Sequence, residues 1–188
     1  MELQIGRLEA LIRNLLEVTR IESRKLLLHP EQLRLDSFVK EIISELQVII
    51  STHQLIITDN EVPFLIADPI RLTQVITNLV TNAVKYSPKA KEVQIAIKEN
   101  NGSIICAIKD FGIGIPIKEQ PLIFERFHQA THNNSNTGLS LGLGLYISKE
   151  IIVQAGGKIW VESEPGQGST FYFSLPLAAA DSTEINQE

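Results

Sequence analysis

Two asparagines and a lysine are spaced so that they share one side of a helix. They belong to the stretch NLVTNAVKYS, residues 78–87. Asn78, Asn82 and Lys85 stand at positions i, i+4 and i+7, which face the same way on an α-helix. A carboxamide oxygen suits Mg²⁺, which takes few protein ligands and keeps phosphate and water oxygens around it. Lys85 is placed to meet a phosphate. The alternative is a solvated helix face with no ligand.

A second candidate binding group follows a strand-like segment. Asp110 opens the stretch DFGIGI, in which Gly112 and Gly114 allow a flat ligand to approach the backbone closely. A carboxylate at a strand end can accept hydrogen bonds from an exocyclic amine and from a ring N–H or a water. The triplet DFG also occurs in protein kinases, but the other signals of that family are absent from this sequence. The remaining alternative is a surface turn after a strand.

Two further stretches are rich in glycine. GLGL, residues 142–145, opens a helix directly after a long loop, and backbone amides at such a helix start can cradle phosphate. The alternative is a glycine turn followed by core leucines. GQGSTF, residues 166–171, is more simply interpreted as a hairpin turn.

The periodicity of the chain predicts the elements that must position these groups. Helices are predicted over residues 1–28, about 37–51, from 69 to just before Pro88, and 143–157. Strands are predicted over residues 55–58, 63–68, 92–99, 103–110, 158–164 and 169–177. Asp36 and Asp68 are the predicted N-caps of the second and third helices. The segment 111–140 lacks periodicity, which indicates a functional lid or a disordered segment. This order predicts an α+β fold, a two-layer sandwich in which helices cover one face of a mixed sheet.

The N-terminal helix carries a wide apolar stripe. The stripe consists of Leu8, Leu11, Leu15 and Val18, widened by Ile5, Ile12, Leu16 and Thr19. Its near-heptad spacing favours a coiled-coil or bundle contact, and the alternative is a helix packed on its own domain. His29-Pro30 ends the pattern, and residues 178–188 are predicted to be a disordered tail.

Composition narrows the class of protein. A chain of 188 residues suits one α/β domain with an appendage. The net charge of −5 is spread over interspersed acids and bases, so no nucleic-acid partner is expected. The single cysteine, Cys106, rules out an internal disulfide and fits a reducing compartment. No apolar run reaches the roughly 20 residues that span a bilayer. We therefore expect a cytoplasmic location, alone or as the cytosolic part of a membrane-bound sensor, without membrane contact by this segment.

Five stretches occur in a characteristic order. They are NLVTNAVKYS, DFGIGI, IFERF, GLGLYISKEI and GGKIWVESEPGQGSTFYFSLP. Together they resemble the N, G1, F, G2 and G3 boxes of the catalytic, ATP-binding domain of sensor histidine kinases. That family shares a superfamily with gyrase, the mismatch-repair ATPases and the heat-shock chaperone ATPase. The resemblance covers residues 31–177 and implies a two-layer α/β sandwich that binds ATP and Mg²⁺.

The resemblance also implies roles for the matched residues. Asn82 would hold Mg²⁺ against the ATP phosphates, Lys85 would contact phosphate, and Tyr86 would line the nucleotide. Asp110 would hydrogen-bond the adenine amino group. The full set implied to contact ATP is Asn78, Asn82, Lys85, Tyr86, Asp110, Gly112, Gly114, Phe124, Phe127, Gly142, Leu143, Gly144 and Thr170.

The lid of the implied nucleotide site departs from the family pattern at two positions. Phe124 and Phe127 would anchor the lid, and the glycines of GLGL would let its end bend over the phosphates. Ser140 replaces the first glycine of many G2 boxes, and Gln129 replaces a basic residue that many members carry after the F box. Serine tolerates fewer backbone angles than glycine, and Gln129 removes one candidate charge that could neutralise phosphate.

Phosphoryl transfer to histidine needs an acceptor that this chain does not supply. The family's acceptor histidine is followed by an acidic residue, then a basic residue and a proline. The four histidines are His29, His53, His128 and His132, and none has that context. Residues 1–29 resemble only the second helix of the family's dimerisation hairpin. We therefore expect the acceptor upstream of Met1 and assign no catalytic residue within the chain.

Three functions stay open at this point. The first function is that of a histidine kinase fragment, which implies a homodimer through the N-terminal helix and a response regulator receiver domain as partner. Alternatively, the chain is an ATPase of the same superfamily. Those enzymes carry a general-base glutamate four residues before the Mg²⁺-binding asparagine, where this chain has Asn78, and a carboxamide does not accept a proton at neutral pH. The third function is a non-catalytic module that senses nucleotide or dimerises.

Overall fold

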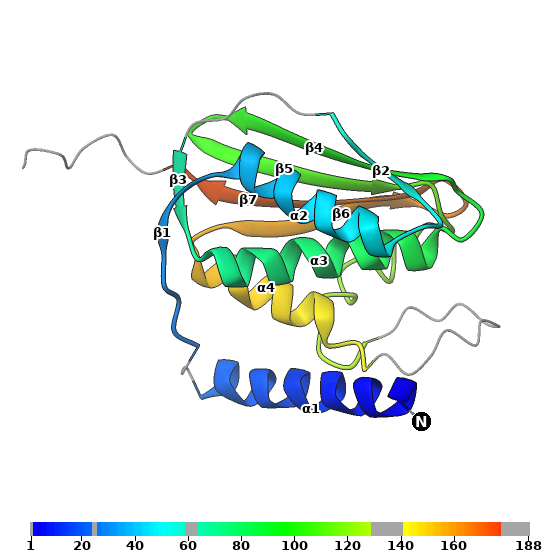
Figure 1. Ribbon diagram of the computed structural model, residues 1–188, viewed down its shortest axis with the longest axis horizontal. Coiled ribbons are helices and arrows are strands. Elements are labelled where there is room, and N and C mark those ends of the chain that lie inside the picture. The colour runs from blue at the N-terminus through cyan, green and yellow to red at the C-terminus, as the bar shows by residue number, and fades with distance from the viewer. Residues whose placement is uncertain (1, 24–25, 59–63, 129–140, 178–188) are drawn as a thin grey trace, which may run out of the picture.

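The computed structural model describes residues 2–23, 26–58, 64–128 and 141–177, which form four helices and seven strands (Figure 1). The helices are α1 (Glu2–Glu22), α2 (Leu35–Ile49), α3 (Pro69–Tyr86) and α4 (Gly144–Gln154). The strands are β1 (Glu31–Arg34), β2 (Gln54–Ile57), β3 (Phe64–Ala67), β4 (Glu92–Asn100), β5 (Ser103–Asp110), β6 (Lys158–Glu164) and β7 (Gly168–Pro176).

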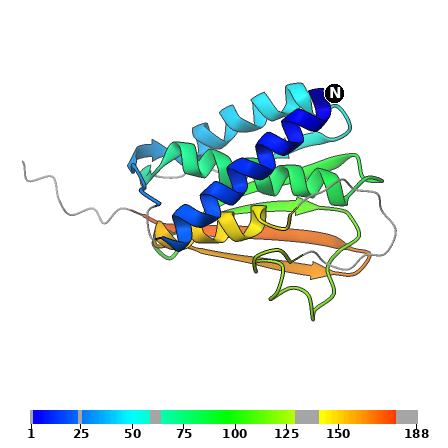
Figure 2. The same cartoon turned by 90° about the horizontal axis from the view of Figure 1, so that it is seen from below.

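Five strands form one mixed sheet in the order β2-β4-β5-β7-β6, with β2 and β4 parallel and the other pairs antiparallel. Figure 1 and Figure 2 show α2, α3 and α4 together on one face of this sheet. Side chains alternate along each strand, so that Ile95, Cys106 and Phe173 are fully buried on the helix side. The predicted α+β sandwich, with helices on one face of a mixed sheet, is confirmed.

A second, two-stranded sheet is absent from the sequence-based prediction. Strand β1 pairs with β3 in antiparallel register, Glu31 opposite Ala67. β1 is only four residues long and none of its side chains is fully buried, so it carries no clear alternation. Helix α2 begins directly at its end. The prediction of Asp36 as the N-cap is therefore wrong, because Arg34 occupies that position and Asp36 lies in the first turn.

The start of α3 agrees with the sequence pattern. Asp68 is the N-cap: one carboxylate oxygen accepts a hydrogen bond from the backbone N–H of Arg71 at 3.1 Å, and Pro69 is the first helical residue. The other oxygen accepts from the N–H of His29 at 2.8 Å. Asp68 thus starts the helix that carries the candidate site and also fixes the segment that enters β1.

Helix α1 is shorter than predicted. It ends at Glu22 rather than residue 28, and Leu26 is buried in an irregular segment where its carbonyl accepts from Gln154 Nε2 at 2.6 Å. The C-terminal half of α1 packs on its own domain through Val18, which is 4% exposed, and through Ile21. Figure 2 shows the helix crossing the α3 and α4 side of the molecule.

Part of the α1 stripe faces away from the domain. Ile12, Leu15 and Leu16 are 51%, 50% and 56% exposed. The helix therefore does pack on its own domain, as the alternative interpretation held, and still presents apolar side chains outward. The boundaries predicted at residues 29–31 and 177–178 stay predictions, and residues 178–188 lie outside the described residues.

Candidate nucleotide site

Helix α3 places its two asparagines side by side. The amide nitrogen of Asn82 lies 3.5 Å from Asn78 Oδ1, a long hydrogen bond. Asn78 Nδ2 in turn donates to the hydroxyl of Ser148 on α4 at 3.0 Å, and Ser148 is 1% exposed. Asn78 therefore joins the two helices. Among the described residues, no hydrogen bond to Asn82 Oδ1 is formed, so this oxygen is available to a ligand.

The glycines of GLGL allow close backbone approach at the start of α4. A Cβ at Gly144 would overlap the amide of Asn78, and a Cβ at Gly142 would overlap the carbonyl of His128. Gly142 also has φ +66°, a conformation that favours glycine. Leu143 between them is 1% exposed and packs in the core. The structure thus gives these glycines a close-packing role, whereas their predicted contact with phosphate remains a prediction.

Asp110 is a buried carboxylate at the end of β5. It is 2% exposed, and its Oδ1 accepts from the N–H of Gly112 at 2.8 Å and of Ser169 at 3.3 Å. Burial raises the pKa of Asp110, and the two backbone hydrogen bonds oppose this rise. No donor among the described residues reaches Oδ2, which leaves one carboxylate oxygen to accept from a ligand.

The C-terminal end of α3 meets the loop that follows Asp110. The carbonyl of Tyr86 accepts from the N–H of Ile113 at 3.2 Å, and a Cβ at Gly112 would overlap that same carbonyl. Gly112 is therefore required for this approach. Gly114, with φ +68°, similarly passes against the backbone of Glu164. These contacts bring the stripe of α3 and the Asp110 loop to one end of the sheet.

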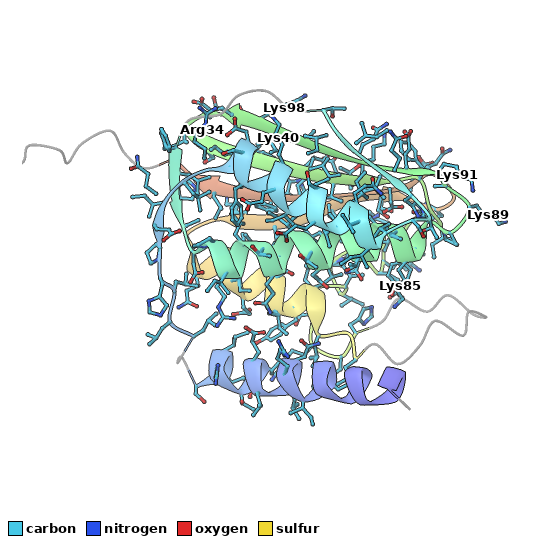
Figure 3. The ribbon with its side chains drawn as sticks, in the orientation of Figure 1. Arg34, Lys40, Lys85, Lys89, Lys91 and Lys98 are labelled. Atoms are coloured by element: carbon cyan, nitrogen blue, oxygen red, sulfur yellow. The ribbon has the colours of Figure 1, made fainter. Side chains whose placement is uncertain are left out.

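Lys85 and Tyr86 lie at that end. Lys85 Nζ is 3.2 Å from the Tyr86 hydroxyl and 4.8 Å from its ring centroid, and Tyr86 is 40% exposed. Figure 3 labels Lys85 at the end of α3.

The two phenylalanines of the F box differ in burial. Phe124 is 7% exposed and packs edge-on against Phe171 of β7, with ring centroids 6.4 Å apart. Phe127 is 58% exposed and has φ +60°. Phe124 therefore anchors the segment after β5 on the sheet, whereas Phe127 does not do so in this conformation. Gln129, His132 and Ser140 lie outside the described residues.

Thr170 lines the same pocket as Asp110 but does not lie directly opposite it. In the β5–β7 register Asp110 lies opposite Ser169, while Thr170 lies opposite Lys109. Ser169 is 6% exposed and shares the face of Asp110, and it is not among the residues predicted to contact ATP. The alternation of β7 contains the signal for this placement, because Phe171 points to the core and position 169 must then do the same.

The candidate metal ligand of the site is an amide oxygen. Among the described residues, no cluster of three or more His, Cys, Asp or Glu side chains could hold a metal ion. A single amide oxygen fits Mg²⁺ that arrives with a nucleotide, because Mg²⁺ completes its coordination shell with phosphate and water oxygens. The free Oδ1 of Asn82 is the protein oxygen that suits it.

A comparison with protein-family models identifies the fold family. Residues 67–179 match the family described as histidine kinase-, DNA gyrase B- and HSP90-like ATPase. The chain belongs to this family. The match begins just before α3 and contains all the residues of the predicted ATP set, and it confirms the resemblance inferred from the five motifs.

Relatives of the chain within this histidine kinase-like ATPase family are sensor kinases. The adaptive-response sensory kinase SasA of Synechococcus elongatus is 34% identical over 178 residues, which cover 93% of this chain and 46% of the relative. The sensor protein kinase WalK of Staphylococcus haemolyticus is 32% identical over 192 residues, covering 97% of this chain and 30% of the relative. The chain thus spans less than half the length of these relatives.

Solved structures show the same fold. Full-length ShkA in complex with AMPPNP has a TM-score of 0.79 and 26% identity, over 94% of this chain and 37% of that one. The catalytic domain of the histidine kinase ThkA has a TM-score of 0.69 and 26% identity, over 79% of this chain and 96% of that domain.

In the described part of the chain, no helix is long and apolar enough to cross a membrane.

Proposed function

We propose that this chain is the ATP-binding catalytic part of a sensor histidine kinase, which transfers the γ-phosphoryl group of ATP to a histidine on a dimerisation hairpin. The observation that carries the proposal is the convergence at the end of α3. Asn82 and Lys85 lie on the helix, and the Tyr86 carbonyl accepts from the loop that follows Asp110. A buried carboxylate whose loop contacts the end of the helix that carries a candidate metal-binding amide and an ammonium group suits a nucleotide.

The residues bind and orient ATP rather than react with it. Asp110 accepts from the exocyclic amine of adenine through Oδ2, Lys85 neutralises phosphate charge, and Asn82 would hold Mg²⁺ through Oδ1. The ion, when bound, supplies positive charge against the oxygens of the transferring phosphoryl group. Catalysis on this account is mostly positioning and charge neutralisation.

Water is a poor competitor for the phosphoryl group in this site. The position of the hydrolytic relatives' glutamate is occupied by Asn78, whose amide nitrogen donates to Ser148. A carboxamide does not take a proton from water at neutral pH. This argues against the ATPase alternative, and the non-catalytic module is distinguished from a kinase by the assay below.

The intact protein is proposed to act as a homodimer that passes the phosphoryl group to a response regulator receiver domain. The exposed Ile12, Leu15 and Leu16 support the dimer, because they form an apolar strip on the outward side of α1. A cytoplasmic location is proposed with them, since ATP is the phosphoryl donor.

The test is labelling of an added helical hairpin that carries the family's acceptor motif. With γ-labelled ATP and Mg²⁺, the chain should place acid-labile label on the hairpin. Asn82→Ala should abolish labelling, whereas Thr81→Ala, an exposed neighbour on α3, should retain it. Absence of labelling with a folded, nucleotide-bound chain would leave the non-catalytic module as the better account.

A further inference from the structure

A buried histidine outside the candidate site holds the end of α3. His53 is 5% exposed and stands just before β2. Its Nε2 lies 2.9 Å from the carbonyl oxygen of Ser87 and 3.2 Å from the Ser87 hydroxyl. Its Nδ1 lies 2.9 Å from the hydroxyl of Thr52. Because a carbonyl only accepts, Nε2 carries the proton and Thr52 donates to Nδ1 in the neutral ring.

The partner of His53 is the residue that ends α3. Ser87 is the C-cap and is 1% exposed. Its hydroxyl donates to the carbonyl of Ala83 at 2.6 Å, and its own carbonyl also accepts from the N–H of Ala90 at 2.9 Å. Ser87 therefore forms hydrogen bonds with the residues before and after it in the chain. His53, which lies 34 residues earlier, connects it to a distant segment.

The segment that carries His53 is itself fixed. Gln47 of α2 donates to the carbonyl of Ile50 at 2.7 Å and to the carbonyl of His53 at 3.0 Å. The same side chain accepts from the N–H of Leu55 at 2.7 Å. His53 thus projects from a short connection held at both ends, which makes it a firm support for Ser87.

Ser87 is connected to the candidate site through the preceding residue, Tyr86. Tyr86, the preceding residue, accepts from Ile113 N–H at 3.2 Å through its carbonyl. Gly112, packed on that carbonyl, donates to Asp110 Oδ1 at 2.8 Å. A shift of the Ser87 backbone would therefore move the Tyr86 carbonyl and the loop that presents the Asp110 carboxylate.

We infer that His53 is a positioning residue of the nucleotide site, which acts through Ser87 on Tyr86 and on the adenine-facing loop after Asp110. His53 touches no ligand in this arrangement. The inference rests on the proposed function, since it assigns His53 a part in nucleotide binding. It predicts that loss of the His53–Ser87 contact weakens binding on the adenine side even without Mg²⁺.

The experiment measures ADP binding by calorimetry in the absence of Mg²⁺, well below the melting temperature of each variant. His53→Ala should weaken binding about tenfold, the order expected for a lost buried hydrogen bond. His53→Gln should restore most of the affinity, because its amide nitrogen reaches the position of Nε2. His53→Asn should not, because its shorter amide reaches only the position of Nδ1.

A core truncation separates positioning from general stability. Val39→Ala removes fully buried volume on α2, outside the chain of contacts from His53 to Asp110, and should lower the melting temperature while leaving ADP affinity within about twofold. Three results would overturn the inference. The first is an ADP affinity of His53→Ala equal to that of the parent, and the second is a loss of ADP affinity in Val39→Ala as large as in His53→Ala. The third is equal ADP affinity of the His53→Gln and His53→Asn variants.

A second readout needs no nucleotide. The amide of Ile113 donates to the Tyr86 carbonyl, so its hydrogen exchange should be about tenfold faster in His53→Ala than in Val39→Ala or the parent. If the parent fails to bind ADP, the proposed function fails on that result alone. Unchanged Ile113 exchange in His53→Ala would overturn the positioning role by itself.

Discussion

Asp110 carries a buried carboxylate that lowers the stability of the fold, and its proposed role in binding nucleotide would account for it. Its carboxylate is buried, its pKa is raised by that burial, and only backbone N–H groups oppose the rise. An ionised acid in such a place destabilises the fold unless it is paired. A ligand amine that donates to Oδ2 would supply the missing partner. The residue therefore has a functional explanation that packing alone does not provide.

Asp110→Asn is expected to raise the melting temperature at pH 7 and to weaken ADP binding about tenfold or more. The amide keeps an acceptor for Gly112 and Ser169 but carries no charge. Since burial raises the pKa of Asp110 in the folded state, the contribution of Asp110 to the stability of the parent is most favourable when its carboxyl is protonated, and this contribution falls as the pH rises through that pKa. The advantage of Asn should thus vanish in melts below pH 3.8, the ordinary pKa of an aspartate side chain. An advantage that persists in acid would contradict this explanation.

Sequence alone was informative about residues that repeat a local pattern and uninformative about residues fixed by distant partners. Asp68 followed by Pro69 predicts the start of α3 correctly, because both act on the adjacent turn. His53 could not be assigned a role, since its partner Ser87 is 34 residues away. The resemblance implies Thr170 as a contact of ATP, whereas the β5–β7 register places Ser169 opposite Asp110.

At the scale of elements, the candidate site depends on how closely α4 approaches α3. Gly144 lies against the Asn78 amide, and Asn78 donates to Ser148 one turn further along α4. This approach also orients Asn82, whose amide nitrogen turns to Asn78 and leaves Oδ1 outward. The contact between the two helices is therefore coupled to the position of Asn82 Oδ1, the proposed metal ligand.

Gly144→Ala should displace the Asn78 side chain and cost about 1–3 kcal/mol of stability, the usual range for overpacking. The Mg²⁺-dependent gain in ATP affinity should also fall. Ser148→Ala is the complementary variant, since it removes the hydrogen bond to Asn78 without adding volume, and it should reduce the same gain. Calorimetric titrations of ATP with and without Mg²⁺ measure this quantity. An unchanged Mg²⁺ dependence in both variants would contradict the coupling.

Helix α1 is attached to the domain by polar contacts of unequal depth. Glu17 is 8% exposed, forms an ion pair with Arg71 and accepts from Gln74 at 2.5 Å. Glu22 pairs with Arg126, but about half of each side chain is exposed. Buried pairs depend strongly on both members, whereas exposed pairs contribute little.

Glu17→Ala should release α1 from α3 and lower stability by about 1–3 kcal/mol, because it leaves Arg71 without its partner acid. Glu22→Ala is the matched control on the same helix and should change stability by less than about 1 kcal/mol. Denaturant melts measure the change in stability, and the rate of proteolysis at Arg20 measures the release of α1. Equal behaviour of the variants would show that burial does not govern this attachment.

The elements themselves were predicted where one face is buried throughout. The alternation of β4 and β5 reflects a sheet covered by helices on one side, and it is visible in the sequence. Strand β1 was missed because its four residues are all at least partly exposed and its pairing partner β3 lies thirty residues later. The end of α1 was missed because Leu26 and its neighbours extend the apolar pattern while tertiary contacts hold them out of a helix.

At the scale of the whole molecule, the exposed strip of α1 predicts self-association. Ile12, Leu15 and Leu16 are each about half exposed on the outward side of the helix. Leu16→Glu combined with Ile12→Glu should shift the chain from dimer to monomer in light scattering at micromolar concentration, because two charges would enter the apolar interface. A parent that is already monomeric at that concentration would contradict the predicted dimer.

On the proposed function, this site delivers the γ-phosphoryl group of ATP to histidine rather than to water. The most direct measurement follows γ-labelled ATP with Mg²⁺ and counts label on an added acceptor hairpin and label released as free phosphate. We expect acid-labile label on the hairpin, loss of that label in Asn82→Ala, and little release of phosphate when the hairpin is omitted. Steady release of phosphate by the chain alone, with no label on the hairpin, would contradict it.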